Sequence, residues 1–200
     1  MTLYDLHCHS THSDGSLSVE ELLRRACEHN VDVLALTDHD SVEGIAEARA
    51  LVEKEQLPLQ FINGVEISCR WESFEIHIVG LNFDPDNEHL KGLLAQQQQR
   101  RYDRFAAILE KLEKRGVMLS AEECQVDGMP TRKHIADTLV EKGIVSHPQK
   151  AFDHYIGKGN SAYVTPQWCD IPEAIEGIHR AGGQAVLAHP HAYKMSNKWL

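Results

Sequence analysis

The sequence of 200 residues has only five cysteines, and no two of them form a C-x-x-C pair. An odd number at scattered positions is typical of reduced thiols and favours a cytoplasmic location over a disulfide framework. No apolar run approaches the roughly 18 residues of a membrane span, and the first segment, MTLYDLHCHS, lacks the apolar core of a signal peptide. The sequence therefore predicts a protein with no membrane partner.

Basic residues are also scarce. The chain has 20 Lys and Arg against 30 Asp and Glu, which gives a formal net charge of −10. A stable complex with duplex nucleic acid needs clustered cations on a broad surface, so this class of function is disfavoured. A small phosphorylated substrate stays compatible, because bound divalent cations reverse the local potential. The sequence carries no signal for the oligomeric state.

Apolar periodicity predicts strands that alternate with helices over the first 83 residues. Strands are expected at 3–7, 31–37, 59–68 and 74–83, and helices at 16–30 and 41–56. Ser18 followed by Glu21 is a capping box for the first helix. This alternation is typical of an α/β fold with a largely parallel sheet or barrel, whose sites lie at the carboxyl ends of the strands.

A helical region then interrupts the alternation. Helices are expected at 86–116, 131–143 and 147–157, with the run QQQQRR at 96–101 as a solvated face. Since no strand is evident between 95 and 165, we expect a helical insertion domain there. The barrel would comprise 1–94 and 166–200, with a helix at 172–183 and a strand at 184–190.

Imidazoles and carboxylates recur at or near the ends of the expected strands. In extended backbone, His7 and His9 lie on one face of the first strand and aim at one point. An isolated histidine on a strand is more often a core residue, and an isolated acid an ion-pair partner. The recurrence favours a metal site instead, with the candidate ligands His7, His9, Asp14, His39, Glu66, His77 and His189. Nitrogen and oxygen ligands of this kind suit divalent transition metals, namely Mn or alternatively Fe or Zn.

The segments that carry these residues also occur in a recognisable order. D-L-H-C-H-S…S-D-G, T-D-H-D, G-V-E-I-S, E-I-H-I-V-G and A-V-L-A-H-P resemble the successive motifs of the PHP (polymerase and histidinol phosphatase) phosphoesterases. The resemblance implies a distorted seven-stranded (β/α)7-type barrel with a trinuclear metal site. The family's last ligands, an Asp-x-His pair, would follow residue 200, so the barrel is expected to be C-terminally incomplete.

The same resemblance implies a role for each candidate ligand. His7 and His9 would hold the first metal, and Glu66 would bridge it to the second. His77 and His189 would complete the second metal. Asp14 and His39 would hold the third, beside the scissile phosphate.

Two longer stretches, VEISCRWESFEIHIVGLN and YVTPQWCDIPEAIEGIHRAGGQAVLAHP, are similar to one bacterial branch of the family, the RNase AM branch. It contains 5′→3′ exoribonucleases and 3′,5′-nucleoside bisphosphate phosphatases. T-R-K-H at 131–134 and G-K-G-N at 157–160 resemble its phosphate-contacting segments. Arg132, His134 and Lys158 are therefore the expected substrate-binding residues, and His134 and Asp14 the candidate catalytic residues. Cations in a first helical turn oppose the helix dipole, which favours a ligand role for Arg132 over a surface role.

The expected function is metal-assisted hydrolysis of the 3′-phosphate of 3′,5′-nucleoside bisphosphates, or 5′→3′ degradation of short RNA. The partner would thus be a small phosphorylated nucleotide or a short oligoribonucleotide. One alternative is another PHP phosphatase of the histidinol-phosphate type. A second is a metal-binding PHP module that is catalytically impaired because the last ligands are absent. A general RNA-binding protein is disfavoured, because basic and aromatic residues are not interleaved.

Overall fold

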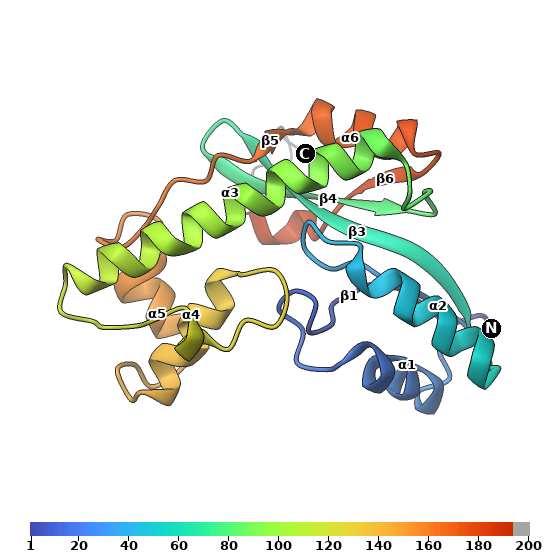
Figure 1. Cartoon of the computed structure of the whole chain (residues 1–200), viewed down its shortest axis with the longest axis horizontal. Coiled ribbons are helices and arrows are strands. Elements are labelled where there is room, and N and C mark those ends of the chain that lie inside the picture. Colours follow the sequence, from blue (N-terminus) through green and yellow to red (C-terminus); the bar gives the residue numbers. More distant parts are fainter. Residues whose placement is uncertain (194–200) are drawn as a thin grey trace.

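A computed structural model of the protein describes residues 1–193 (Figure 1). The described strands are β1 (Tyr4–Cys8), β2 (Val33–Leu36), β3 (Gln60–Trp71), β4 (Phe74–Leu81), β5 (Cys169–Asp170) and β6 (Gln184–Leu187). The helices are α1 (Val19–Glu28), α2 (Glu43–Glu55), α3 (Glu88–Glu113), α4 (Arg132–Glu141), α5 (Pro148–Ala151) and α6 (Ile171–Arg180). Short 3-10 turns span Glu122–Cys124 and Pro190–Tyr193, and a π-helical turn spans Phe152–Ile156. Within this part of the chain, no helix is both long enough and apolar enough to cross a membrane.

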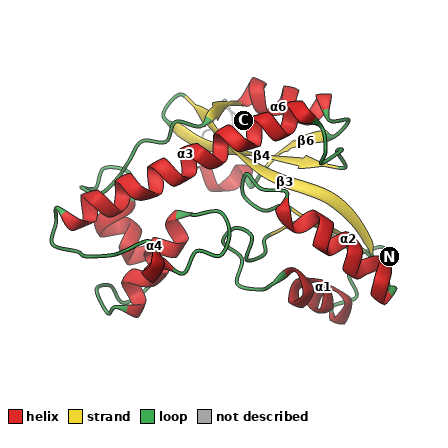
Figure 2. Ribbon diagram, viewed as in Figure 1, coloured by secondary structure: helices red, strands yellow, loops and turns green. Residues whose placement is uncertain are grey.

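The six strands form one curled sheet, seen as yellow ribbons in Figure 2. Its order is β1-β2-β3-β4-β6, and β5 pairs with the far end of β3. Strands β1, β2 and β3 are parallel, whereas β4 is antiparallel to both β3 and β6. The expected α/β fold is confirmed as an incomplete, half-barrel sheet. The antiparallel strand departs from a largely parallel sheet because only two residues, Glu72 and Ser73, join β3 to β4. Such a link makes a hairpin and is too short for a parallel crossover.

The long strand β3 lies at the centre of the main core. Its alternate residues Val65, Ile67 and Cys69 are completely buried, in the same cluster as α6 and the first half of α3. A second cluster packs α1 and α2 against β2. Helices α1, α2 and α6 and the first half of α3 therefore each bury an apolar face on the sheet, as an α/β architecture requires.

Helix α3 belongs to two hydrophobic clusters at once. Leu90 and Leu94 pack on the sheet cluster, whereas Ile108 and Leu112 pack with α4 and α5 in a third cluster drawn from residues 105–162. In Figure 1 this long green helix runs from the sheet to the helical lobe. The expected boundary at residue 95 falls inside α3, and the division into barrel and insertion domain stays a prediction.

The run QQQQRR is a solvated face only in part: Gln96 and Gln99 are exposed, but the expectation is wrong for Gln97 and Arg101. Gln97 is 0% exposed and Arg101 is 7% exposed. The Oε1 atom of Gln97 accepts a hydrogen bond from the Cys169 N–H at 3.0 Å, which ties α3 to β5. Polar side chains can be buried when their hydrogen-bonding groups are satisfied by partners from distant strands.

Candidate metal centre

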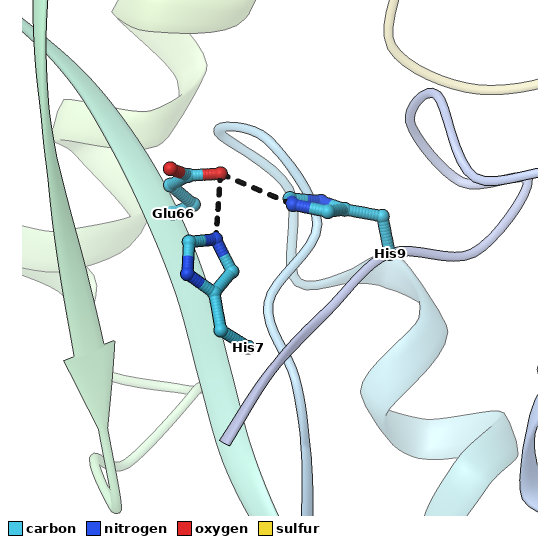
Figure 3. Close-up of side chains that lie close together, drawn as sticks. All are labelled: His7, His9 and Glu66. Atoms are coloured by element: carbon cyan, nitrogen blue, oxygen red, sulfur yellow. Dashed lines mark ion pairs between the residues drawn. The ribbon is translucent and has the colours of Figure 1, made fainter. Parts of the chain in front are cut away.

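Glu66, in the middle of β3, is the centre of the imidazole cluster. Its side chain is 1% exposed. Its Oε2 atom lies 3.1 Å from His7 Nε2 and 3.2 Å from His9 Nε2 (Figure 3). Its Oε1 atom lies 2.9 Å from both His77 Nδ1 and His189 Nε2. His39 Nδ1 is 3.3 Å from Oε2. One buried carboxylate thus meets five imidazoles that are far apart in the sequence.

Sheet register explains how the later histidines reach Glu66. His77 pairs with Ser68 across the β3–β4 hairpin, so His77 and Glu66 are diagonal neighbours on one face of the sheet. His39 follows β2 and forms an isolated parallel bridge with Glu66. His189 follows β6 and has a positive φ of 28°. A positive φ is uncommon for a residue with a side chain and costs backbone strain.

Asp14 extends the cluster beyond Glu66. Its Oδ2 atom lies 3.7 Å from His39 Nε2, and the rings of His39 and His9 are stacked with centroids 4.6 Å apart. Within the described residues, three ligand groups have donor atoms that all lie within 4.8 Å of one another: His7, His9 and Glu66; His9, Asp14 and His39; and His39, Glu66 and His77. The structure therefore brings together all seven residues that the sequence marks as candidate ligands. His9, His39 and Glu66 are each shared between two groups.

Sequence reasoning missed Asp38, the residue before His39. This carboxylate is 2% exposed and binds the loop that connects His9 to Asp14. Asp38 Oδ1 accepts hydrogen bonds from the Ser10 N–H at 2.8 Å and from Ser13 Oγ at 2.6 Å, and Oδ2 accepts one from Ser10 Oγ at 2.6 Å. The serines between the histidines of HSTHSD were the available signal, since hydroxyls in such a loop need a buried acceptor. Asp38 supports the ligands without belonging to a ligand group.

The protonation states suit a metal centre. Burial alone would raise the pKa of Glu66, but hydrogen bonds from His7, His77 and His9 outweigh it and hold that pKa well below its usual range. The carboxylate is therefore ionised. Burial, followed by the positive charge of Arg101, lowers the pKa of His39 well below its ordinary value. His39 is thus a neutral imidazole, which is the form that ligates metals.

The hydrogen bonding of the cluster also fits a bound cation. His39 Nδ1 and His189 Nδ1 are buried nitrogens that have no hydrogen-bond partner in the described part of the chain. A buried polar atom without a partner is uncommon and requires an explanation. One carboxylate has about four lone-pair sites, too few to satisfy five imidazoles and leave every ring nitrogen paired. Divalent cations among these donors would account for both observations.

A cleft of about 220 Å³ adjoins the cluster. Asp14, His39 and His77 line one side of it. The other side is formed by the cations and aromatic rings of the helical region: Arg101, Arg104, Arg132, Lys133, Phe152 and Trp168. A single cavity therefore joins the candidate metal centre to a positively charged wall.

The three residues expected to bind substrate lie in different environments. Arg132 lines the cleft. His134 completes the N-terminal capping box of α4, where its Nδ1 accepts a hydrogen bond from the Thr131 N–H at 3.0 Å. Lys158 does not line the cleft; its Nζ donates to the Ser73 carbonyl at 2.9 Å and lies 5.9 Å from the centre of the Phe74 ring.

Arg101 and Arg104 are cleft residues that sequence reasoning missed. Arg101 Nε donates to Asp40 Oδ2 at 2.6 Å, and its Nη2 donates to Ser68 Oγ at 2.6 Å. Arg104 forms two parallel bonds with the Glu75 carboxylate at 2.8 and 2.9 Å. Both arginines project from one face of α3, because residues three apart are neighbours on a helix. Their spacing in the polar run was the only local signal.

A curled α/β sheet that gathers imidazoles and carboxylates at one site defines a metal-dependent hydrolase of the α/β-barrel class. The PHP domain model matches residues 5–155, and the chain belongs to the PHP domain family.

Individual relatives specify the activity further. The chain is 48% identical over 199 residues to a 5′-3′ exoribonuclease of Haemophilus influenzae, covering 98% of this chain and 72% of that protein. It is 38% identical over 199 residues to the 3′,5′-nucleoside bisphosphate phosphatase of Chromobacterium violaceum, covering 98% and 69%. It is also similar to the solved structure of an amidohydrolase from Chromobacterium violaceum with bound sulfate and no metal. That match has a TM-score of 0.92 and 36% identity, and it covers 98% of this chain and 70% of the other. The protein is a PHP phosphoesterase, a hydrolase that acts on phosphoric ester bonds.

Proposed function

We propose that the protein removes the 3′-phosphate of 3′,5′-nucleoside bisphosphates, or degrades short RNA from its 5′ end. The observation that carries this proposal is the shared cleft, in which the imidazole cluster and the arginine wall face the same space. A ligand with two anionic groups can place one at each side. The names of the relatives, an exoribonuclease and a bisphosphate phosphatase, describe substrates of this kind.

The candidate ligands would hold two to three divalent cations. His7 and His9 with Glu66 would form one site, and His77 and His189 with Glu66 a second. Asp14 and His39 would form a third. Mn is the proposed metal, with Fe or Zn as alternatives, because all three accept nitrogen and oxygen ligands. When bound, such cations supply Lewis acidity and generate a nucleophile at neutral pH.

Residues of the helical region would bind and orient the substrate. Arg132 would hold the second, non-reacting phosphate through parallel hydrogen bonds. Because His134 Nδ1 accepts the Thr131 N–H, the proton of the neutral ring resides on Nε2, which could donate it to the leaving oxygen. The charge of Asp14 acts on His134 and opposes the effect of burial, which lowers the pKa of His134. Lys158 would attract the nucleotide from the outer edge.

The domain division and the location are further parts of the proposal. Residues 95–165 would form the helical insertion domain, and 1–94 with 166–200 the barrel. The separate hydrophobic cluster around α4 supports this division. All five cysteine thiols are free, which supports a cytoplasmic location.

Turnover on matched substrates tests the function. With Mn²⁺ present, adenosine 3′,5′-bisphosphate should be hydrolysed with a kcat/KM at least about 100-fold above that of histidinol phosphate, because only the former has a second phosphate for Arg132. A 5′-phosphorylated tetraribonucleotide measures the exonuclease activity. A preference for histidinol phosphate would contradict the proposal. Tightly bound metal without turnover on any phosphoester would instead favour the impaired module.

Replacing Arg132 by alanine tests the second-phosphate site. The kcat/KM for adenosine 3′,5′-bisphosphate should fall by about 10- to 100-fold, since a charge-assisted bond to phosphate is lost. For adenosine 3′-monophosphate, which lacks the second phosphate, the loss should stay below about threefold. Lys150→Ala, which removes an exposed cation from α5, serves as the control and should change neither value. Equal losses on the two substrates would refute the assignment of Arg132.

A further inference from the structure

Glu75 is the carboxylate of the cleft that both Arg104 and Arg132 contact. It is the second residue of β4 and lines the cleft. Its carboxylate accepts two hydrogen bonds from Arg104 at 2.8 and 2.9 Å and one from Trp168 Nε1 at 3.3 Å. Arg132 Nη2 lies 3.3 Å from Oε1 and 3.4 Å from Oε2. Arg104 therefore binds this carboxylate at shorter distances than Arg132 does.

The three guanidinium groups of the cleft differ in how many N–H groups remain available. Arg104 also donates from Nε to the Val164 carbonyl at 3.1 Å and is 8% exposed, so all three of its nitrogens are engaged. Arg101 is engaged by Asp40, Ser68 and the Pro130 carbonyl. Arg132 donates to Glu75 through Nη2 alone, at 3.3 and 3.4 Å, its guanidinium lies 5.6 Å from the centre of the Phe152 ring, and its side chain is 28% exposed. Among the described residues, Arg132 is thus the arginine of the cleft that can exchange its partner.

Charge counting gives the same result. Arg101, Arg104, Arg132 and Lys133 contribute four positive charges, and their partners Asp40, Glu75 and Asp137 contribute three negative charges. The arginine wall therefore has a net charge of +1. One monoester phosphate at Arg132 matches this surplus better than two would, because a second anion would face the Glu75 carboxylate.

The position of Glu75 on β4 also fixes how far Arg132 lies from the imidazole cluster. Glu75 and His77 are two residues apart on one strand, so their side chains lie on the same face, about 7 Å apart along the strand. His77 contacts Glu66 at the metal cluster. The strand therefore acts as a rigid spacer between the reacting end of the cleft and the arginines.

We infer that Glu75 is a positioning and specificity residue: it anchors Arg104, holds Arg132 until a phosphate replaces it, and limits the cleft to one non-reacting phosphate. This inference rests on the proposed function, because Arg132 is taken as the ligand of that phosphate. In this role Glu75 acts through Arg132.

Binding of adenosine 5′-monophosphate to the full chain, measured by calorimetry, tests the inference without turnover. Glu75→Gln should bind this nucleotide about tenfold more tightly, because the carboxylate that competes for Arg132 is removed. Kinetics on adenosine 3′,5′-bisphosphate should show lower KM together with a kcat reduced about tenfold, since the phosphate is bound but no longer held in register. Damage to the fold alone would not tighten binding. Unchanged or weaker binding by a folded Glu75→Gln protein overturns the inference.

A double-mutant cycle tests whether Glu75 acts through Arg132. In an Arg132→Gln background, the gain from Glu75→Gln should shrink below about threefold. A gain of the same size as in the wild-type background overturns the positioning role. Glu72→Gln removes an exposed carboxylate from the same hairpin and should leave affinity unchanged.

A second variant covers the case in which Glu75→Gln fails to fold. Glu75→Asp keeps the charge opposite Arg104 and shortens the reach to Arg132, so binding of adenosine 5′-monophosphate should tighten about threefold. No gain in affinity overturns the inference.

The outcomes also separate the proposed function from the proposed role of Glu75. Tighter nucleotide binding without turnover in any variant would reject the proposed function and keep the role of Glu75. Turnover on the bisphosphate with no effect of Glu75 on nucleotide binding would keep the proposed function and reject the role of Glu75.

Discussion

Replacing Glu66 by glutamine is expected to remove the bound transition metal and to lower kcat on phosphoesters at least about 1000-fold. Glu66 is the acid that all five imidazoles approach, at 2.9–3.3 Å. Glutamine keeps the shape of the side chain but removes the negative charge, and its amide nitrogen turns a donor toward nitrogens that need an acceptor. Under the proposed function, a neutral residue at this position would leave the positive charge of the cations without its buried counter-charge.

Two measurements check this result independently. Metal content per chain after dialysis, determined by mass spectrometry, should fall to below half of the wild-type value. Turnover on adenosine 3′,5′-bisphosphate should fall in parallel. Glu47→Gln is the matched control, because Glu47 contacts an imidazole too, His12 Nε2 at 3.4 Å, but on the surface of α2. Wild-type metal content in Glu66→Gln would show that the cluster does not hold its cations through this acid.

The position of Glu66 could be predicted from the sequence because the signal was local and repeated. Each histidine motif lies at a strand or directly after one, and the sheet places those segments side by side whatever the length of chain between them. The capping box of Ser18 and Glu21 was confirmed for the same reason, since both of its hydrogen bonds form within one helical turn. Predicting the imidazole cluster thus required knowledge of strand positions but little knowledge of packing.

Arg101 and Arg104 reach the cleft only through packing between distant segments, and sequence reasoning therefore missed them. Nothing in the run around Arg101 distinguishes a solvated helix face from one that covers β3. The difference arises from partners far along the chain: Asp40 lies 61 residues before Arg101, and Glu75 lies 29 residues before Arg104. A buried cation was foreseeable only by pairing each helical arginine with an acid on a strand. The antiparallel course of β4 could have been predicted, because the hairpin link is short.

The ion pair of Asp40 and Arg101 gives the largest expected effect on stability. Asp40 is 0% exposed and Arg101 is 7% exposed, with 2.6 Å between Oδ2 and Nε. Asp40 Oδ1 also accepts the Ser68 N–H at 2.8 Å, so one carboxylate joins the loop after β2 to β3 and α3. Its backbone N–H donates to the Glu66 carbonyl at 3.0 Å, which connects the pair to the imidazole cluster.

Asp40→Asn is expected to lower the free energy of unfolding by about 3–5 kcal/mol, because it leaves the buried Arg101 charge without its counter-ion. Asparagine isolates the charge: Asp40 has a positive φ of 49°, a conformation that asparagine adopts as readily as aspartate. Urea unfolding followed by circular dichroism measures the loss. Asp103→Asn, at an exposed position of α3 where the carboxylate accepts a bond from Gln99, should cost less than about 0.5 kcal/mol. A loss below about 1 kcal/mol for Asp40→Asn would mean that water or another group compensates Arg101, and that the wall of the cleft does not depend on this pair.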